Sequence, residues 1–176
     1  MRAYHFSAFT FIAAAVGACT GAPDQHVRLG TLAFDVPGGW HDTRETRRGV
    51  LTAVWAPEDN ARKESVTVIR SELAPNVAGA AAQSPALVAQ LAEQAQAGLA
   101  DARITPATTY TVASGLAGVR LDVEFVPPGL RERYHRVHIV LVDRTALVHV
   151  LYTARSAEAN PPALGLVLRS LREEAS

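Results

Sequence analysis

Histidine, arginine and aspartate side chains recur in three neighbouring stretches of the C-terminal half that we expect to form strands: Arg120, Asp122, Arg136, His138 and His149. A hairpin that turns at Asp143-Arg144 sets His138 opposite His149, so the two imidazoles become cross-strand neighbours with their β-carbons about 5 Å apart. A pair of imidazoles in contact is a natural starting point for a metal site. The rest of such a site would have to come from the adjoining strand.

The preceding hairpin is predicted to bring a carboxylate and two guanidinium groups to the same face. Alignment of its apolar positions sets Asp122 opposite Arg136 and Arg120 opposite His138. His138, His149 and Asp122 are then candidates for a metal site, because zinc usually takes three or four ligands, and the arginines could hold a small anion. The alternative, which we favour, is a polar strip whose charges pair in solvent, since exposed ion pairs are common and mostly inert.

No catalytic motif accompanies these residues. Ser114 follows Ala113 and precedes Gly115, but the glycine that a nucleophile elbow requires two residues before the serine is missing. His135 and His138 lack the spacing of the helical metalloprotease motif, and the sequence contains no phosphate loop or dinucleotide fingerprint. We therefore expect a protein that is not an enzyme and that has no catalytic residues and no cofactor.

The N-terminus has the pattern of an export signal. Arg2 supplies a positive charge, and residues 6–16 form an apolar run of about a dozen residues. A permanent transmembrane helix needs about 20 apolar residues, so this run is too short to span a bilayer. We interpret residues 1–18 as a signal peptide that is removed.

The four residues that close this run, Val16-Gly17-Ala18-Cys19, resemble the lipobox of bacterial lipoproteins. The resemblance implies that Cys19 carries diacylglycerol on its sulfur and a further acyl chain on its amino group, and several chains together anchor a protein stably. Cys19 is the only cysteine in the chain, so no intrachain disulfide competes for it. The alternative is an ordinary secretory signal cleaved after Ala18, which leaves Cys19 free.

Location and partners follow from the same region and from the charge. Thr20 in place of aspartate resembles the sorting pattern of outer-membrane lipoproteins, so we expect a cell-envelope protein that is lipid-anchored at the outer membrane, on its periplasmic or surface face. Residues 19–26 form the lipidated cysteine and a short tether, and residues 27–176 form one globular domain. The formal net charge is zero, from 17 basic and 17 acidic side chains, so we expect no nucleic acid partner. The expected partners are the membrane and another envelope protein.

The domain is predicted to consist of strands with two helices. Stretches of period-two alternation or short apolar runs bounded by turn residues predict strands over residues 27–36, 50–55, 65–73, 104–112, 119–125, 133–142 and 146–153. Ser84-Pro85 and Asn160-Pro161-Pro162 begin two amphipathic helices that run to about residues 99 and 171. The polar run 41–48 is expected to be an exposed loop. The last two strands are apolar on both faces, so we expect them in the centre of the sheet, covered from both sides.

This order of elements resembles that of a known group of small domains. Phe34-Asp35-Val36-Pro37 followed by Trp40, then residues 115–121, then a strand hairpin and a terminal Leu168-Arg169-Ser170-Leu171 are similar to the PsbP/DcrB-like group. The resemblance spans residues 27–172. It implies an α+β fold, with one antiparallel sheet of about six or seven strands flanked by helices in an α/β/α sandwich. It also implies an adaptor, accessory subunit or chaperone rather than an enzyme.

Two classes of function remain open at this point. The favoured one is a non-enzymatic, lipid-anchored protein-binding or accessory module, which should expose an apolar patch of several hundred Å². The alternative is a periplasmic module that binds a small ligand or a metal, which should have a concave pocket near His138 and His149.

Overall fold

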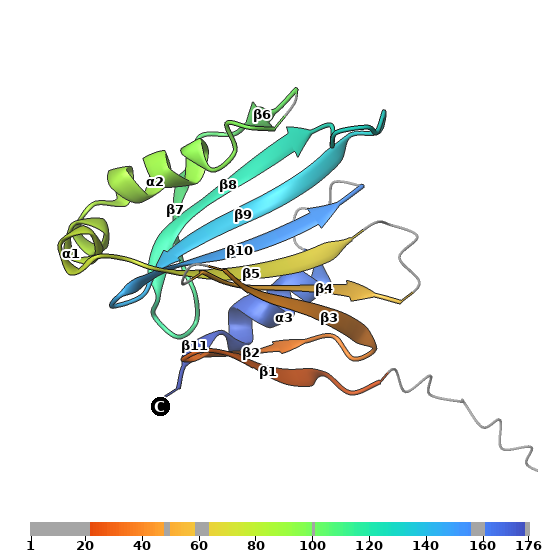
Figure 1. The fold of residues 1–176 in the computed structure, drawn as a ribbon, viewed down its shortest axis with the longest axis horizontal. Coiled ribbons are helices and arrows are strands. Elements are labelled where there is room, and N and C mark those ends of the chain that lie inside the picture. Colours follow the sequence, from red (N-terminus) through yellow and green to blue (C-terminus); the bar gives the residue numbers. More distant parts are fainter. Residues whose placement is uncertain (1–21, 48–49, 59–63, 100, 156–160, 175–176) are drawn as a thin grey trace, which may run out of the picture.

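The computed structural model describes residues 22–47, 50–58, 64–99, 101–155 and 161–174 (Figure 1). Cys19 and the predicted signal peptide lie outside these residues. The larger of two antiparallel sheets has the strand order β3-β4-β5-β10-β9-β8-β6, and β7 pairs with β8 beside β6. Its strands are β3 (Trp40–Arg47), β4 (Val50–Pro57), β5 (Ser65–Glu72), β6 (Arg103–Ile104), β7 (Thr108–Thr111), β8 (Ala117–Phe125), β9 (Tyr134–Val142) and β10 (Ala146–Ala154).

A smaller sheet and three helices pack on the two faces of the larger sheet. The smaller sheet consists of β1 (Gln25–Leu29), β2 (Leu32–Val36) and β11 (Arg172–Glu173), and it shares one core with α3 (Pro162–Ser170). Helices α1 (Pro75–Gln83) and α2 (Pro85–Gln94) form a second core on the opposite face, over β8 and β9 (Figure 1). No helix in the described part of the chain has both the length and the apolar character needed to cross a membrane.

The start signal at Ser84-Pro85 operates as predicted, whereas Asn160 of the second signal lies outside the described residues. The Ser84 hydroxyl accepts a hydrogen bond from the Leu87 backbone N–H at 3.3 Å, and Pro85 occupies the first turn of α2. Val88 and Ala92 of α2 are buried against the sheet. Helix α3 also has proline at its start. The expected antiparallel sheet is confirmed, but strands dominate the fold and helices cover only parts of the larger sheet.

Two predicted elements are wrong in the N-terminal region. Residues 27–36 form the hairpin β1–β2 rather than one strand, and Gly30 adopts a positive φ of 65° at its turn. The predicted tether is also shorter than expected, since Gln25 and His26 belong to β1. The predicted loop at residues 41–48 is largely the edge strand β3, in which residues 41–46 are all exposed. A strand with no buried face has no hydrophobic alternation, and its charges suit an unpaired edge.

Three smaller elements were also missed or merged. Helix α1 is short, rich in alanine and without a side-chain cap, so it carries little sequence signal. The predicted strand 104–112 is divided into β6 and β7, which pair with different parts of β8. Strand β11 follows α3 directly and completes the smaller sheet, which the sequence did not indicate.

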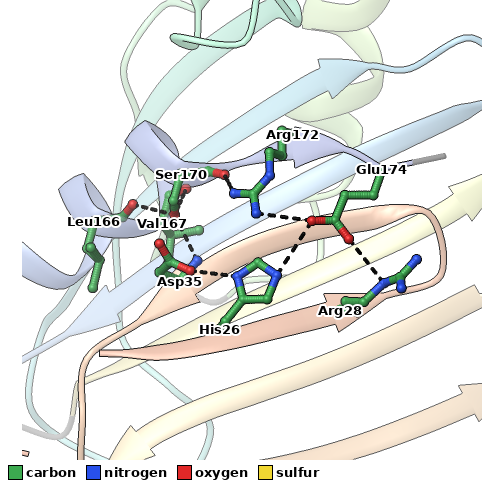
Figure 2. Close-up of polar contacts among 8 residues, drawn as sticks. All are labelled: His26, Arg28, Asp35, Leu166, Val167, Ser170, Arg172 and Glu174. Atoms are coloured by element: carbon green, nitrogen blue, oxygen red, sulfur yellow. Dashed lines mark hydrogen bonds and ion pairs between the residues drawn. The ribbon is translucent and has the colours of Figure 1, made fainter. Parts of the chain in front are cut away.

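Polar contacts join this C-terminal end of the chain to the N-terminal hairpin (Figure 2). Glu174 lies 3.3 Å from Arg28 and 3.0 Å from Arg172, and the Asp35 backbone N–H donates to the Ser170 hydroxyl at 2.7 Å. The His26 ring lies between the carboxylates of Asp35, at 2.8 Å, and Glu174, at 3.6 Å. The two ends of the domain are therefore held in one layer by contacts far apart in sequence.

The face of the larger sheet that carries α1 and α2 is only half covered by the described residues (Figure 1). Beyond β9, six half-exposed side chains alternate with residues buried on the opposite face, and we call this surface the open face: Thr52, Val54, Thr67, Ile69, His149 and Leu151. The expectation that β10 is covered from both sides is therefore wrong for His149 and Leu151, whereas Leu147 at the start of the strand is buried in the core beneath α2. Strand β9 is buried on both faces over residues 137–141, as expected.

Gly118 is predicted to be indispensable to the pairing of β8 with β9. A β-carbon at this position would collide with the backbone carbonyl oxygen of Val140, and backbone cannot move aside without breaking the ladder. We expect Gly118→Ala to lower the free energy of unfolding by at least about 2 kcal/mol. The control is Gly79→Ala in α1, where nothing lies within 4 Å and the helix should gain up to about 1 kcal/mol. Urea denaturation checks both, and equal effects of the two changes would contradict this account.

Candidate functional site

The structure brings the two predicted histidines together. The Nε2 atom of His138 lies 3.0 Å from Nδ1 of His149, and the rings stack with centroids 5.2 Å apart. The register differs from the prediction, since the hairpin turns at Arg144-Thr145 and His149 pairs with Val140. This shift moves the pairing by two residues, which keeps both histidines on the same face because side chains alternate with a period of two. They meet as diagonal neighbours.

Asp122 and Arg120 do not join them, and this part of the prediction is wrong. Strand β9 is displaced by one residue relative to the predicted pairing with β8, so Asp122 pairs with Val137 and Arg120 with Ile139. A displacement of one residue moves every side chain to the other face of the sheet. Asp122 instead lies 3.2 Å from Nε2 of His135. It therefore cannot complete a metal site with His138 and His149.

The residue that does complete the cluster is Gln96, near the end of the helix predicted to start at Ser84-Pro85. Gln96 follows α2, is 1% exposed and lies 2.9 Å from Nδ1 of His138 through its side-chain nitrogen. Its side-chain oxygen accepts a hydrogen bond from Arg136 at 3.2 Å. Gln96 comes four residues after Ala92 and eight after Val88, so it continues the side of α2 that these two residues bury. A glutamine at this position interrupts the apolar stripe, so its burial was not predicted.

Arg136 anchors the other end of this polar network. Its Nε donates to the Thr153 hydroxyl at 3.1 Å, and its guanidinium lies 4.7 Å from the centroid of the Phe125 ring. We call Arg136, Gln96, His138 and His149 the histidine network. It joins α2 to three strands of the larger sheet.

The positions of the protons follow from Arg136. Because arginine can only donate, the Gln96 side-chain oxygen must be the acceptor, and its nitrogen then donates to Nδ1 of His138. His138 therefore carries its proton on Nε2 and donates it to Nδ1 of His149, which leaves the His149 proton on Nε2. Both imidazoles are neutral in this arrangement. A second proton on His138 would face the Gln96 amide hydrogens.

The electrostatics of the network also oppose charge on either ring. Burial lowers the pKa of His138 from 6.5 to about 3, and the nearby His149 and Arg136 act in the same direction. Burial likewise lowers the pKa of His149 from 6.5 to about 4. Burial also lowers the pKa of Arg136. The network is thus a set of mutually satisfied polar groups in which neutral imidazoles are favoured.

His138 and His149 together would supply two ligands to a metal ion. Across the described residues, no group of three histidine, cysteine, aspartate or glutamate side chains gathers in a position to hold an ion. The larger cavities in this part of the chain are lined by other residues and do not include His138 or His149. A concave pocket beside the two histidines, which the ligand-binding alternative predicted, is therefore not among them.

A second cluster contains the residue types of a catalytic triad without its geometry (Figure 2). The Ser170 hydroxyl donates to the Leu166 carbonyl at 2.8 Å, as expected of a serine one turn along a helix. It also accepts the backbone N–H of Asp35. Both nitrogens of His26 face carboxylates rather than Ser170. This arrangement stabilises the chain ends and does not activate a nucleophile.

Comparison with known proteins places the fold. No protein-family model and no curated protein sequence matches the chain. The solution structure of cyanobacterial PsbP (CyanoP) from Synechocystis sp. PCC 6803 matches with a TM-score of 0.56 and 18% identity, over 92% of this chain and 99% of that chain. The crystal structure of PA94 from Pseudomonas aeruginosa, described as a protein of unknown function and putative regulator, has a TM-score of 0.42 and 18% identity, over 74% of this chain and 82% of that chain.

The first of these similarities confirms the PsbP-like fold that the sequence suggested. At 18% identity it establishes the arrangement of the chain and not its activity. Function must therefore be argued from this chain's own surfaces and cavities.

The histidine network predicts a specific loss of stability in acid. Above about pH 6.5 the unfolded and folded states both hold neutral histidines, whereas between pH 6.5 and about 4 only the unfolded state takes up protons. The free energy of unfolding should therefore fall as the pH drops through this window. Each histidine contributes a slope of at most about 1.4 kcal/mol per pH unit. We expect His149→Asn, whose side-chain oxygen can still accept from His138, to reduce the slope by about one such contribution.

Urea denaturation between pH 4.5 and pH 7 measures this slope. The control is Gln94→Leu, which changes an exposed residue without a titratable group and should leave the slope unchanged. An identical pH dependence in the wild type and in His149→Asn would rule out a neutral His149 in the folded state.

Gln96 is predicted to hold the network together. Gln96→Leu fills a similar volume but leaves Nδ1 of His138 and one nitrogen of Arg136 without their partner, at a cost of about 1–3 kcal/mol for each buried group. The control, Gln94→Leu, changes an exposed residue of the same helix and should alter stability by less than about 0.5 kcal/mol. If chemical denaturation gives the same value for both variants, Gln96 has no such role.

Proposed function

We propose that this chain is a lipid-anchored lipoprotein of the cell envelope, attached through Cys19, and that its domain is a non-enzymatic protein-binding or accessory module. The N-terminal pattern of a charged residue, a short apolar run and Val16-Gly17-Ala18-Cys19 supports the anchor. Since β1 begins at Gln25, five residues, Thr20 to Asp24, separate the lipid from the fold. Five residues span at most about 18 Å even when fully extended. The domain would therefore act close to the membrane surface.

The observation that carries the binding proposal is the open face. Its six side chains have hydroxyl, aliphatic or imidazole groups and carry no fixed charge, and all are half-exposed. Exposed large apolar side chains elsewhere in the described part of the chain, Val77, Ile104 and Leu130, lie on separate elements. A broad, uncharged surface with aliphatic groups at its centre is typical of the core of a protein interface.

We propose that the occupant of the open face is an amphipathic helix of another envelope protein. The same face of the sheet is already covered over β8 and β9 by α1 and α2, so a helix from a partner would continue an existing layer. The hydroxyls of Thr52 and Thr67 and the ring of His149 can satisfy polar groups at its border. Glu45 of β3 pairs with Thr52 and lies at the border of this face, at the edge of the sheet.

Site-specific crosslinking in intact cells tests this proposal. A photoreactive amino acid at Ile69, in the middle of the open face, should give one dominant adduct with an envelope protein. The same amino acid at Glu93, which is exposed on α2, should not. Mass spectrometry of the adduct should map the crosslinked partner residues to positions i, i+3, i+4 and i+7 of one helix. The charged variant Val54→Glu should abolish the adduct, because it places a carboxylate inside the interface.

Two further outcomes would overturn parts of the proposal. Crosslinks from Ile69 to a second copy of this chain would mean that the open face is a dimer interface. Equal crosslinking from Ile69 and Glu93 would mean that the open face has no specific occupant.

The anchor is tested separately with Cys19→Ser, which should release the protein from membranes and lose the adduct. A Cys19→Ser protein that still fractionates with membranes would contradict lipidation at Cys19.

A further inference from the structure

A cavity of about 280 Å³ lies between α3 and the strands β7 and β8, on the face of the sheet opposite the histidine network. Val112, Leu164 and Leu168 give it an apolar floor, and all three are buried. Tyr110, Thr111 and two arginines, Arg120 and Arg169, also line it. Its volume is just below the roughly 300–1,000 Å³ range of ligand pockets, so its occupant must be small.

The Arg169 side chain lies over this cavity because Gly165, one turn earlier in α3, has no side chain in its way. A β-carbon added to Gly165 would lie 3.0 Å from a terminal nitrogen of Arg169, so the guanidinium rests directly on the bare backbone of α3. Gly165 and Arg169 both line the cavity. Within the described residues, no carboxylate forms an ion pair with Arg169, and its charge is available to a ligand.

Arg120 supplies a second guanidinium whose charge is already offset. Its Nε and one terminal nitrogen each lie 3.3 Å from an oxygen of Asp122. Asp122 also contacts His135 at 3.2 Å, so its carboxylate is shared between two groups. Among the described residues that line the cavity, Arg169 therefore carries the one positive charge that no ion pair offsets. This balance suits a ligand with a single negative charge better than a phosphate dianion.

We propose that this cavity binds a small carboxylate with a short apolar body. The planar guanidinium of Arg169 matches the two oxygens of a carboxylate, and bonds between charged groups of this kind are stronger than neutral hydrogen bonds. The apolar body would lie on Leu164, Leu168 and Val112, and the hydroxyl of Tyr110 could donate to the same carboxylate. The site lies on the side of the larger sheet away from the open face, so it is separate from the proposed protein interface.

Benzoate and benzamide are matched probes, because they share one shape and differ in charge. The full-length chain is reconstituted in lipid nanodiscs and titrated with each probe by ligand-observed NMR, with empty nanodiscs as the baseline. We expect benzoate to bind at least about tenfold more tightly than benzamide, and Arg169→Gln to remove that preference. Gly165→Ala keeps the arginine but displaces its guanidinium, so it should weaken benzoate binding severalfold.

Controls separate lost binding from lost folding. Arg169 is exposed, so Arg169→Gln should leave the melting temperature without ligand unchanged. Arg133→Gln removes one positive charge from an exposed residue that does not line the cavity, and it should bind benzoate like the wild type. The proposal is overturned if benzoate binding does not exceed the nanodisc baseline, if benzamide binds equally well, or if Arg169→Gln retains the wild-type affinity.

Discussion

The pairing register of β9 with its two neighbours is the constraint on which the rest of the structure depends. Side chains alternate along each strand, so the register decides which of them share a face. In the observed register, His138 and Arg136 lie on the α2 side with His149, while Asp122 lies on the α3 side with His135. A displacement of β9 by one residue would move His138 and Arg136 to the α3 side and His135 to the α2 side. It would also turn Val140 away from the core beneath α2.

On the α2 side of the larger sheet, this register produces the histidine network. Polar groups removed from water must find partners, and here each group in the histidine network has one. The arrangement has a direction, from the obligatory donor Arg136 through Gln96 and His138 to His149. It also fixes the end of α2 on the sheet, because Gln96 belongs to the turn that follows that helix. The network therefore positions the end of α2 as well as the two imidazoles.

The sequence predicted those elements that bury one regular face. Strands β8, β9 and β10 and helices α2 and α3 have clear periodicity, and their approximate positions were correct. Strand β3 was missed because its residues 41–46 are all exposed, and the hairpin β1–β2 was merged because Gly30 alone marks its turn. The contact between His138 and His149 was predicted although the register of β9 with β10 was wrong by two residues, because a shift of two residues keeps a side chain on the same face. The register of β8 with β9 was wrong by one residue, and Asp122 was therefore placed on the wrong face.

The two faces of the larger sheet explain why its surfaces differ in chemistry. On the α3 side the smaller sheet completes the cover, so most side chains of β4, β5 and β10 there are apolar and buried, as Ala53, Val68 and Val150 show. On the α2 side the chain's own helices cover β8, β9 and only the start of β10, at Leu147, and the uncovered parts of β4, β5 and β10 carry Thr52, Thr67 and His149. Threonine fits a pleated surface and also hydrates well. The side chains that these strands direct to the α2 side are therefore compatible with contact with water. Their aliphatic groups also provide apolar surface that can stabilise a partner. His149 lies where the open face meets the histidine network, so the uncovered half of the sheet is joined to the turn after α2 by two hydrogen-bonded contacts, His149 to His138 and His138 to Gln96.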